Sequence, residues 1–434
     1  MRGKAGSRCT REQIAPYVGD EMVISQNRMR SRVFLRFCVP YLDNNATTQP
    51  SPAVSQAVTR ALTELWHNPS SIHRAGQAAR QAVELARASC ARLINAKPRE
   101  ITFTSGGTEA LDLAIRGVLA ARKPGSPATL VTSKVEHAAI RDLADELERT
   151  KQANVRWLAL TSEGCIDPAG LNVIDTSTTL VAVQWANNET GAIQPLADIA
   201  RRCKACNVPL LVDATQWVGK MPTDVTRLPD SAGEVSDPFD FLVASAHKFH
   251  GPKGVGMLWT RAGVRMRPQL LGSQELGRRG GTENVPGIIG AGVAAEEAAA
   301  FLADAAQRDR IAQLRDAFER DVLAAIPDAR VNGPTTADAR LWNTTNIAFP
   351  KLEAEALLLL LSERHVAASA GAACSSGSLD PSPVLLAFGV PDDLAHGSVR
   401  FSLSKHTTAA EVTSATREVI DAVKQLRRSW NAIA

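Results

Sequence analysis

One lysine lies where two predicted strands are joined by a glycine-rich turn. Lys248 follows the apolar run FDFLVA within the stretch SAHKFHGPKG, and the run VGMLW begins shortly after it. Such a lysine is either a solvated charge of the turn or an amine enclosed by apolar walls. An enclosed amine loses its proton readily and can then add to a carbonyl group. Lys248 alone leaves both interpretations open.

Three further groups capable of chemistry follow strand-like runs elsewhere in the chain. The stretch TSGGTEA places Gly107 and Thr108 at the start of a predicted helix, where backbone N–H groups can bind a phosphate. It lacks the ending of a P-loop, and a glycine turn with an N-cap threonine explains it equally well. Asp213 ends the run PLLV and could either bond to a protonated ring nitrogen or cap a turn. His137 could stack on a planar ring or serve a structural role.

The elements that carry these residues alternate between strands and helices from Tyr41 onward. Strands are expected in EITFTS, TLVTS, LVAVQWA, PLLVDA, FDFLVAS and GVGMLW, and helices in TEALDLAIRGVLAARK, HAAIRDLADELERT and PLADIARRCKAC. Short, continuous apolar strands are typical of a mostly parallel sheet with helices on both faces. The carboxyl ends of such strands share one edge, where ligands bind. We therefore expect the polar residues that follow the strands to meet in one crevice.

The pattern changes after about residue 295. A long helical stretch, AGVAAEEAAAFLADAAQRDRIAQLRDAFERDVLAAI, precedes the strand TTNIAF, a helix around EAEALLLLLSE, the strand SVRFSLS and a last helix in TAAEVTSATREVIDAVKQLRRSW. This indicates a smaller α+β domain. We predict a large domain over residues 56–295 and a small domain formed by residues 41–55 and 296–434.

Residues 1–40 are arginine-rich and show no sustained periodicity. They lack the apolar core of a secretory signal, and their acidic residues argue against an organellar presequence. We expect either a disordered extension or a translation start assigned too far upstream, with Met22 or Met29 as the real one.

The composition excludes several classes of protein. The 49 Lys and Arg residues exceed the 45 Asp and Glu residues by only four, and they are too scattered to indicate nucleic-acid binding. No apolar stretch approaches the roughly 18–20 residues that a membrane span needs. The seven cysteines make no disulfide framework, and the pair Cys203 and Cys206 lacks a second ligand pair for zinc. We expect a cytoplasmic protein with reduced thiols and no membrane or nucleic-acid partner.

Taken together, the chemical groups describe a pyridoxal phosphate site. A phosphate-binding turn, a strand-end aspartate, a histidine and a lysine would converge at one sheet edge. Lys248 would form the Schiff base with the cofactor. Asp213 would keep the pyridine nitrogen protonated, so that the ring accepts electrons. The combination favours the enclosed amine over the solvated charge.

Eight motifs, in order, resemble the cysteine desulfurases among the fold-type I pyridoxal phosphate enzymes, most of all the nitrogenase-associated NifS group. They are YLDNNATTQPSPAV, NPSSIH, FTSGGTEALDLAI, WANNETGAIQPL, VDATQWVGKMPTD, HKFHGPKGVG, GRRGGTENVPGIIGAGVAAE and RFSLSKHTT. The likeness covers about residues 41–425. It implies the α/β transferase fold of type I, a homodimer, and conversion of L-cysteine to L-alanine with the sulfur kept as an enzyme persulfide.

The resemblance implies roles for residues at the cofactor. Lys248 matches the lysine that binds the cofactor covalently, and His137 matches the histidine that stacks on the ring and transfers protons. Either of the two could remove the substrate α-proton. Asp213 would pair with the pyridine nitrogen and Gln216 with the phenolic oxygen.

Other matched residues bind the substrate and the phosphate. Asn188 and Arg400 would hold the substrate carboxylate, for which a guanidinium fork is suited. Asn188 would also contact the cofactor. Thr282 would reach the phosphate from the other subunit. The phosphate contacts within the chain would be Gly107, Thr108, Ser245 and His247.

The sulfur acceptor within the chain would be Cys374, in SAGAACSSGSLDPSP. Its small neighbours and the prolines that follow predict a mobile loop, which lets the thiolate approach the substrate sulfur and carry it outward. The alternative is a small buried thiol. The onward acceptor would be an iron–sulfur scaffold protein. A role in nitrogenase maturation would bring Cys374 into transient contact with a nascent cluster, and a housekeeping role stays open.

The stretch GSQELGRR departs from the family pattern. Ser273 and Leu276 stand where NifS-like sequences typically have a histidine and an arginine, which leaves partner docking open. The alternatives on the same fold are a selenocysteine lyase or another small-amino-acid enzyme, such as an aminotransferase. An alternative of another class is a non-catalytic scaffold-binding protein, against which Lys248 and its partners argue.

Overall fold

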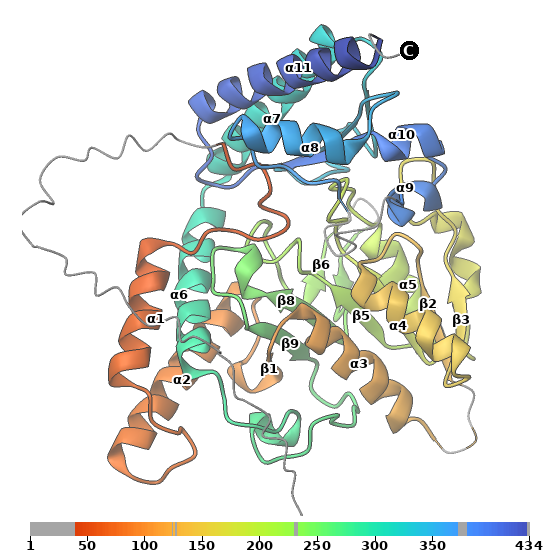
Figure 1. The fold of residues 1–434 in the computed structure, drawn as a ribbon. Helices are drawn as coiled ribbons and strands as arrows, with labels where there is room; N and C mark the ends of the chain where they lie inside the picture. The colour runs from red at the N-terminus through yellow and green to blue at the C-terminus, as the bar shows by residue number, and fades with distance from the viewer. Residues whose placement is uncertain (1–39, 124, 126–127, 230–232, 372–379, 432–434) are drawn as a thin grey trace, which may run out of the picture. The chain divides into compact units, whose positions relative to one another are not determined.

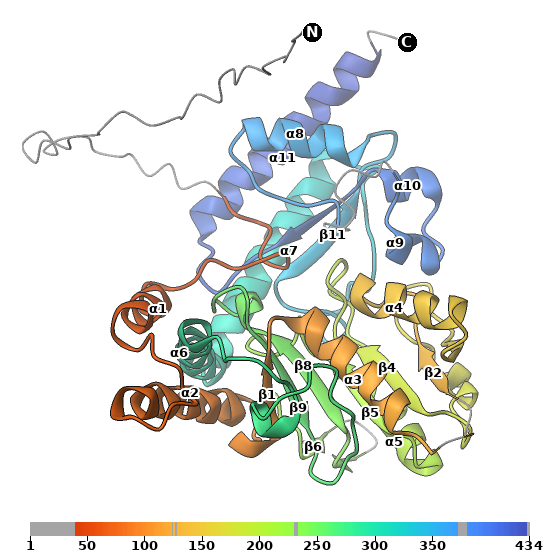
Figure 2. The same ribbon diagram turned by 60° about the horizontal axis from the view of Figure 1, so that its bottom comes forward.

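The computed structural model describes residues 40–431 except 124, 126–127, 230–232 and 372–379, and Figures 1 and 2 show their arrangement. The main sheet has seven strands in the order β1-β9-β8-β5-β4-β2-β3. They are β1 (Ile101–Thr104), β2 (Thr129–Thr132), β3 (Asn154–Trp157), β4 (Leu180–Gln184), β5 (Leu210–Asp213), β8 (Phe241–Ser245) and β9 (Gly256–Thr260). Of these, only β9 runs against its neighbours. The predicted, mostly parallel α/β sheet is confirmed. β3 was missed because this edge strand is not a continuous apolar run.

Helices cover both faces of the main sheet (Figure 1). Neighbouring residues of β5 illustrate this: Leu211 packs in one apolar cluster with α3 and α4, and Val212 packs in the opposite cluster with α2, α5 and α6. The alternation follows from the two-residue period of a strand. The helices are α1 (Pro52–Glu64), α2 (Arg74–Leu93), α3 (Gly107–Ala121), α4 (Ala138–Arg149), α5 (Leu196–Cys206) and α6 (Val285–Leu302), with the 3-10 helices η1 (Pro98–Glu100), η2 (Pro168–Val173), η3 (Ala246–Lys248) and η4 (Glu275–Gly277). Strands β6 (Arg227–Leu228) and β7 (Val235–Ser236) form a separate two-stranded sheet that is not paired with the main sheet.

Glycines let α6 pack closely against α1 and α2. A Cβ on Gly292 would lie 2.7 Å from Cα of Ala86 in α2, and one on Gly290 would lie 2.6 Å from Cγ2 of Val58 in α1. Among the described helices, α6 alone is long and apolar enough to cross a membrane, with a mean hydropathy of 1.4, but 56% of it is buried within the protein. This is the pattern of a core helix.

A second, antiparallel sheet has its own apolar core. Its strands are β10 (Arg330–Val331), β11 (Thr344–Ala348) and β12 (Ser398–Ser402), accompanied by α7 (Ala305–Ala325), α8 (Ala354–Glu363), α9 (Pro383–Ala387), α10 (Asp392–His396) and α11 (Ala409–Asn431). Figure 2 shows α7, α8 and α11 together beside β11. The long helical stretch after residue 290 is two helices rather than one, because Asp304 caps α7 by accepting from the backbone N–H of Ala306.

The chain passes from the first core to the second within α6. Ala298 packs in the core of the main sheet, and Phe301 packs in the core of the second sheet. Leu42 also lies in the second core, whereas Val54 lies in the first. The boundaries at residues 55–56 and 295–296 stay predictions.

Candidate functional site

The strand order brings the predicted residues to one edge of the main sheet. β8, β5, β4 and β2 are parallel neighbours, so their carboxyl ends lie in a row. Lys248 ends η3, directly after β8, and Asp213 ends β5. His137 precedes α4, shortly after β2. The topology of the sheet therefore brings these residues to one edge, where ligands bind in folds of this kind.

The Lys248 amine is half-buried and donates to two backbone carbonyls. Its Nζ donates to the carbonyl oxygen of Asn45 at 2.7 Å and to that of Ala46 at 2.8 Å. Gln216 Nε2 donates to the same Asn45 oxygen at 3.0 Å. The amine and the amide that were assigned to the cofactor thus converge on one atom. Asn45 was missed as a site residue, although the motif YLDNNATT contains it.

His137 is the N-cap of α4, and its Nδ1 accepts from the backbone N–H of Ala139 at 3.1 Å. Burial lowers the pKa of His137, and the positive charge of Lys248 lowers it further, while Asp213 opposes them. The ring is therefore neutral at neutral pH. Since Nδ1 accepts, the ring proton is on Nε2.

Glu136, next to His137, is a buried carboxyl group with two donors. Its Oε1 accepts from Ser133 Oγ and its Oε2 from the backbone N–H of Gln184, each at 2.6 Å. Burial raises the pKa of Glu136 to about 8, and nearby Asp213 contributes to the rise. A neutral carboxyl group at this position limits the negative charge around Asp213.

The start of α3 offers an anion site at the same edge. A Cβ on Gly107 would lie 3.2 Å from Thr215 Oγ1 and 3.7 Å from Ser245 Cβ, so the first turn of α3 faces both residues. The N-cap of α3 is Gly106, which has no side chain to occupy the N–H groups of that turn. Thr108 lies on the same turn and is exposed. Thr215 was missed, although it follows Asp213 closely.

His247 lies on η3, two residues after Ser245. Its Nδ1 is 3.2 Å from Thr47 Oγ1. Burial lowers the pKa of His247 to about 4, with a further contribution from Lys248, so the ring is a neutral hydrogen-bonding group. The amine, strand-end carboxylate, glycine turn and neutral histidines together fit pyridoxal phosphate by the chemistry of their donor set.

Arg400 and Asn188, the two residues expected to bind the substrate carboxylate, are in direct contact. Arg400 on β12 is 1% exposed, and its Nη1 donates to the carbonyl oxygen of Asn188 at 3.1 Å. Its Nη2 contacts Asp43 Oδ1 at 2.6 Å, a partner that sequence reasoning missed. The buried Nε makes no hydrogen bond to the described residues. The role of Arg400 in holding the substrate carboxylate stays a prediction.

Cys374 lies outside the described residues. The described residues on either side of segment 372–379 approach one buried carboxyl group. Ser382 Oγ donates to Glu189 Oε2 at 2.6 Å, and a Cβ on Gly371 would lie 2.6 Å from that oxygen. The carbonyl oxygen of Gly371 also accepts from Arg400. Glu189 thus contacts both flanks of the segment, and it is one of the polar residues that follow the strand run LVAVQWA in the sequence.

Thr282 is exposed and lines a depression of about 210 Å³ with Ser105. Its reach into a partner subunit stays a prediction. Leu276 is 72% exposed and has a φ of 58°. The adjacent Glu275 is buried and anchors this segment through Arg87, with Nη–Oε distances of 2.7 and 2.8 Å.

Known proteins are similar to this chain in fold and in sequence. A family model for class-V aminotransferases matches residues 40–414. The chain is 45% identical to cysteine desulfurase 2 of Trichormus variabilis over 395 residues. This alignment covers 90% of this chain and 94% of that protein. It is 42% identical over 390 residues to the cysteine desulfurase NifS of Azotobacter vinelandii, with coverages of 89% and 93%.

A solved structure of a NifS-like protein matches with a TM-score of 0.79 and 32% identity, over 88% of this chain and 99% of that one. The fold and the sequence identity therefore indicate the same family, and the residues at the strand ends are consistent with it. The chain therefore belongs to the class-V aminotransferase family and, within it, to the cysteine desulfurases.

Proposed function

We propose that this protein is a pyridoxal phosphate-dependent enzyme that converts L-cysteine to L-alanine and passes the sulfur through a persulfide on Cys374. The observation that carries the proposal is the placement of the Lys248 amine beside the Gln216 amide, at the edge that also holds Asp213 and His137. The desulfurase names of the relatives support the substrate.

The cofactor would be bound from several sides of the sheet edge. Lys248 would hold it covalently, and Asp213 and Gln216 would bond to its ring. The phosphate would lie at the first turn of α3, with contacts from Gly107, Thr108, Ser245 and His247. When bound, pyridoxal phosphate supplies an electron sink that makes the substrate α-proton acidic.

The protein's own groups would bind cysteine and move protons. Arg400 and Asn188 would hold the carboxylate of the substrate. Lys248 or His137 would accept the α-proton, and the neutral state of His137 allows it to act as a base. The Cys374 thiolate would form an S–S bond to the substrate sulfur while the substrate Cβ–S bond breaks. A proton equivalent to the one lost by the Cys374 thiol would be added at Cβ, and the α-proton would return to Cα to complete alanine.

The wider setting is part of the proposal. The protein would act in the cytoplasm as a homodimer in which Thr282 completes the partner's phosphate site. The sulfur would pass to an iron–sulfur scaffold protein. The likeness to NifS of Azotobacter vinelandii supports nitrogenase maturation as the destination, and a housekeeping route is the other possibility.

Two substitutions test the proposal. Cys374→Ala should keep the visible absorbance of the cofactor and its change on addition of cysteine, but lose sulfide release. Lys248→Ala should lose the covalent cofactor absorbance. Cys165→Ala, which alters a partly buried thiol outside the site, is the matched control and should retain activity. Full sulfide release by Cys374→Ala would refute the persulfide mechanism, and labelled cysteine would identify the protein that receives the sulfur.

A further inference from the structure

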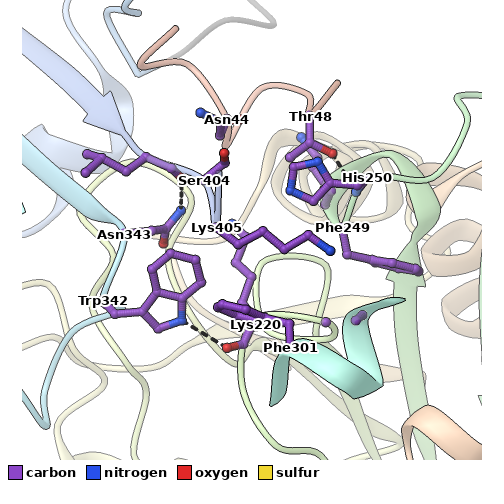
Figure 3. A pocket seen from close by; sticks show the side chains of 14 residues that line it. Asn44, Thr48, Lys220, Phe249, His250, Phe301, Trp342, Asn343, Ser404 and Lys405 are labelled. Atoms are coloured by element: carbon purple, nitrogen blue, oxygen red, sulfur yellow. Dashed lines mark hydrogen bonds between the residues drawn. The ribbon is translucent and has the colours of Figure 1, made fainter. Parts of the chain in front are cut away.

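Lys220 is a buried lysine that the proposed chemistry does not use. It is 5% exposed, and its Nζ donates to Gln216 Oε1 at 2.6 Å and to Asn45 Oδ1 at 2.8 Å. Figure 3 shows it with Trp342, whose Nε1 donates to the Lys220 carbonyl oxygen at 2.9 Å. Both the side chain and the backbone of Lys220 are therefore held in place.

The surroundings of Lys220 do not form a separate ligand site. The cavity beside it measures about 20 Å³, whereas ligand pockets typically measure about 300–1,000 Å³. Its charged neighbours include the cations Lys248 and Arg400, and burial, followed by these charges, holds the pKa of Lys220 well below its usual range. Burying an amine among cations is costly, so its hydrogen bonds need an explanation.

The hydrogen bonds of Lys220 orient the Gln216 amide. Oε1 faces the Lys220 amine, and Nε2 faces the carbonyl oxygen of Asn45. A reversed amide would place Oε1 against that carbonyl oxygen, and both are acceptors. In the observed orientation, Gln216 Nε2 and Lys248 Nζ both donate to the carbonyl oxygen of Asn45. Nε2 carries a second hydrogen, which can be donated to another acceptor.

We propose that Lys220 is a positioning residue for the cofactor: it fixes the Gln216 amide so that Nε2 donates to the phenolic oxygen of pyridoxal phosphate linked to Lys248. This rests on the proposed function, which supplies the cofactor. A donor at the phenolic oxygen stabilises its ionised form. The nitrogen of the lysine–cofactor linkage then holds its proton less tightly, which lowers the pH at which that proton leaves.

The test is a pH titration of the visible absorbance of the substrate-free holoenzyme. Lys220→Met should move the midpoint upward by about 0.4–1 pH unit, the equivalent of one hydrogen bond. Gln216→Leu should move it upward as well. The double variant should match Gln216→Leu, because Lys220 acts through the amide. Lys405→Met is the control: it removes another lysine from the same cavity and should leave the midpoint unchanged.

The groups that surround Lys220 allow this titration to be interpreted. They are Lys248, His250, Arg400 and Lys405. The pKa of His250 is about 4 because of burial, so its ring does not change charge between pH 6 and 10.

Each outcome decides the matter. An unshifted midpoint in Lys220→Met, or an equal shift in Lys405→Met, overturns the inference. A further shift when Lys220→Met is added to Gln216→Leu also overturns it, because the amine would then act through its charge. If Lys220→Met alone does not fold, the comparison of the double variant with Gln216→Leu decides. Wild-type protein that shows no such absorbance after cofactor is added refutes the proposed function itself.

Discussion

His137 combines a structural and a chemical role, and two substitutions separate them. The Nδ1 atom caps α4, while the ring lies close enough to Asp213 and Lys248 for their charges to change its pKa. His137→Asn keeps a side-chain acceptor for the backbone N–H of Ala139, because asparagine is a favoured N-cap. His137→Ala removes both the acceptor and the ring.

The expected magnitudes differ for the two roles. An N-cap replaced by alanine typically costs about 0.5–2 kcal/mol, so His137→Ala should be about 1 kcal/mol less stable than His137→Asn. Loss of a positioned acid–base group typically costs about 10²–10⁴-fold in rate. Both variants should therefore lose sulfide release by a similar factor within that range.

The assay pairs guanidinium denaturation of the holoenzyme with the rate of sulfide release from cysteine. If His137→Asn retained nearly wild-type activity while His137→Ala lost it, the ring would act only as a cap. If the two variants were equally stable, the hydrogen bond to Ala139 would contribute nothing to α4.

Three further predictions concern buried titratable groups. Glu136→Gln should not destabilise the protein at pH 7, because a raised pKa of about 8 leaves the wild-type carboxyl group protonated there. The wild-type protein should lose stability as the pH rises from about 4.5 to 8, because the unfolded state releases the Glu136 proton over this range, and Glu136→Gln should abolish that loss. Glu275→Gln should cost about 3–5 kcal/mol in denaturation, because it leaves the Arg87 charge buried, and adding Arg87→Met should recover part of the loss. The wild-type protein should lose stability as the pH falls from about 6.5 to 4, because over this range His250 binds a proton in the unfolded state but not in the folded state, where its pKa is about 4. His250→Gln should reduce that loss by up to about 1.4 kcal/mol per pH unit.

Each of these predictions has a contradicting result. A destabilised Glu136→Gln at pH 7 would show that the charged carboxylate is the native form. Additive losses in the Arg87 and Glu275 variants would show that the pair is not coupled. An unchanged acid profile for His250→Gln would show that its ring is protonated in the folded protein. Unfolding midpoints across a pH series measure all three.

Much of the site was predictable because it follows strand ends. Lys248, Asp213 and His137 each come after an apolar run, and parallel strands bring their carboxyl ends to one edge. The helices on both faces were also predictable from the pattern of apolar residues. The break at Asp304 was missed, because the helical pattern on either side is strong and a single aspartate caps the second helix.

The partners of these residues were not predictable in the same way. Asn45 bonds to Gln216 and Lys248, which lie 171 and 203 positions away in the chain. The raised pKa of Glu136 and the lowered pKa of Lys220 result from burial by remote segments, and no local pattern reports that burial.

The sequence by itself determined which elements form and which chemical groups end them, because the apolar period and the turn residues act over a few neighbouring positions. Only the tertiary structure decided how those groups are charged, oriented and hydrogen-bonded. Asn45, Lys220 and Glu189 acquire their positions in the site when distant segments pack together and exclude water, and that desolvation sets both the hydrogen-bond partner and the protonation state.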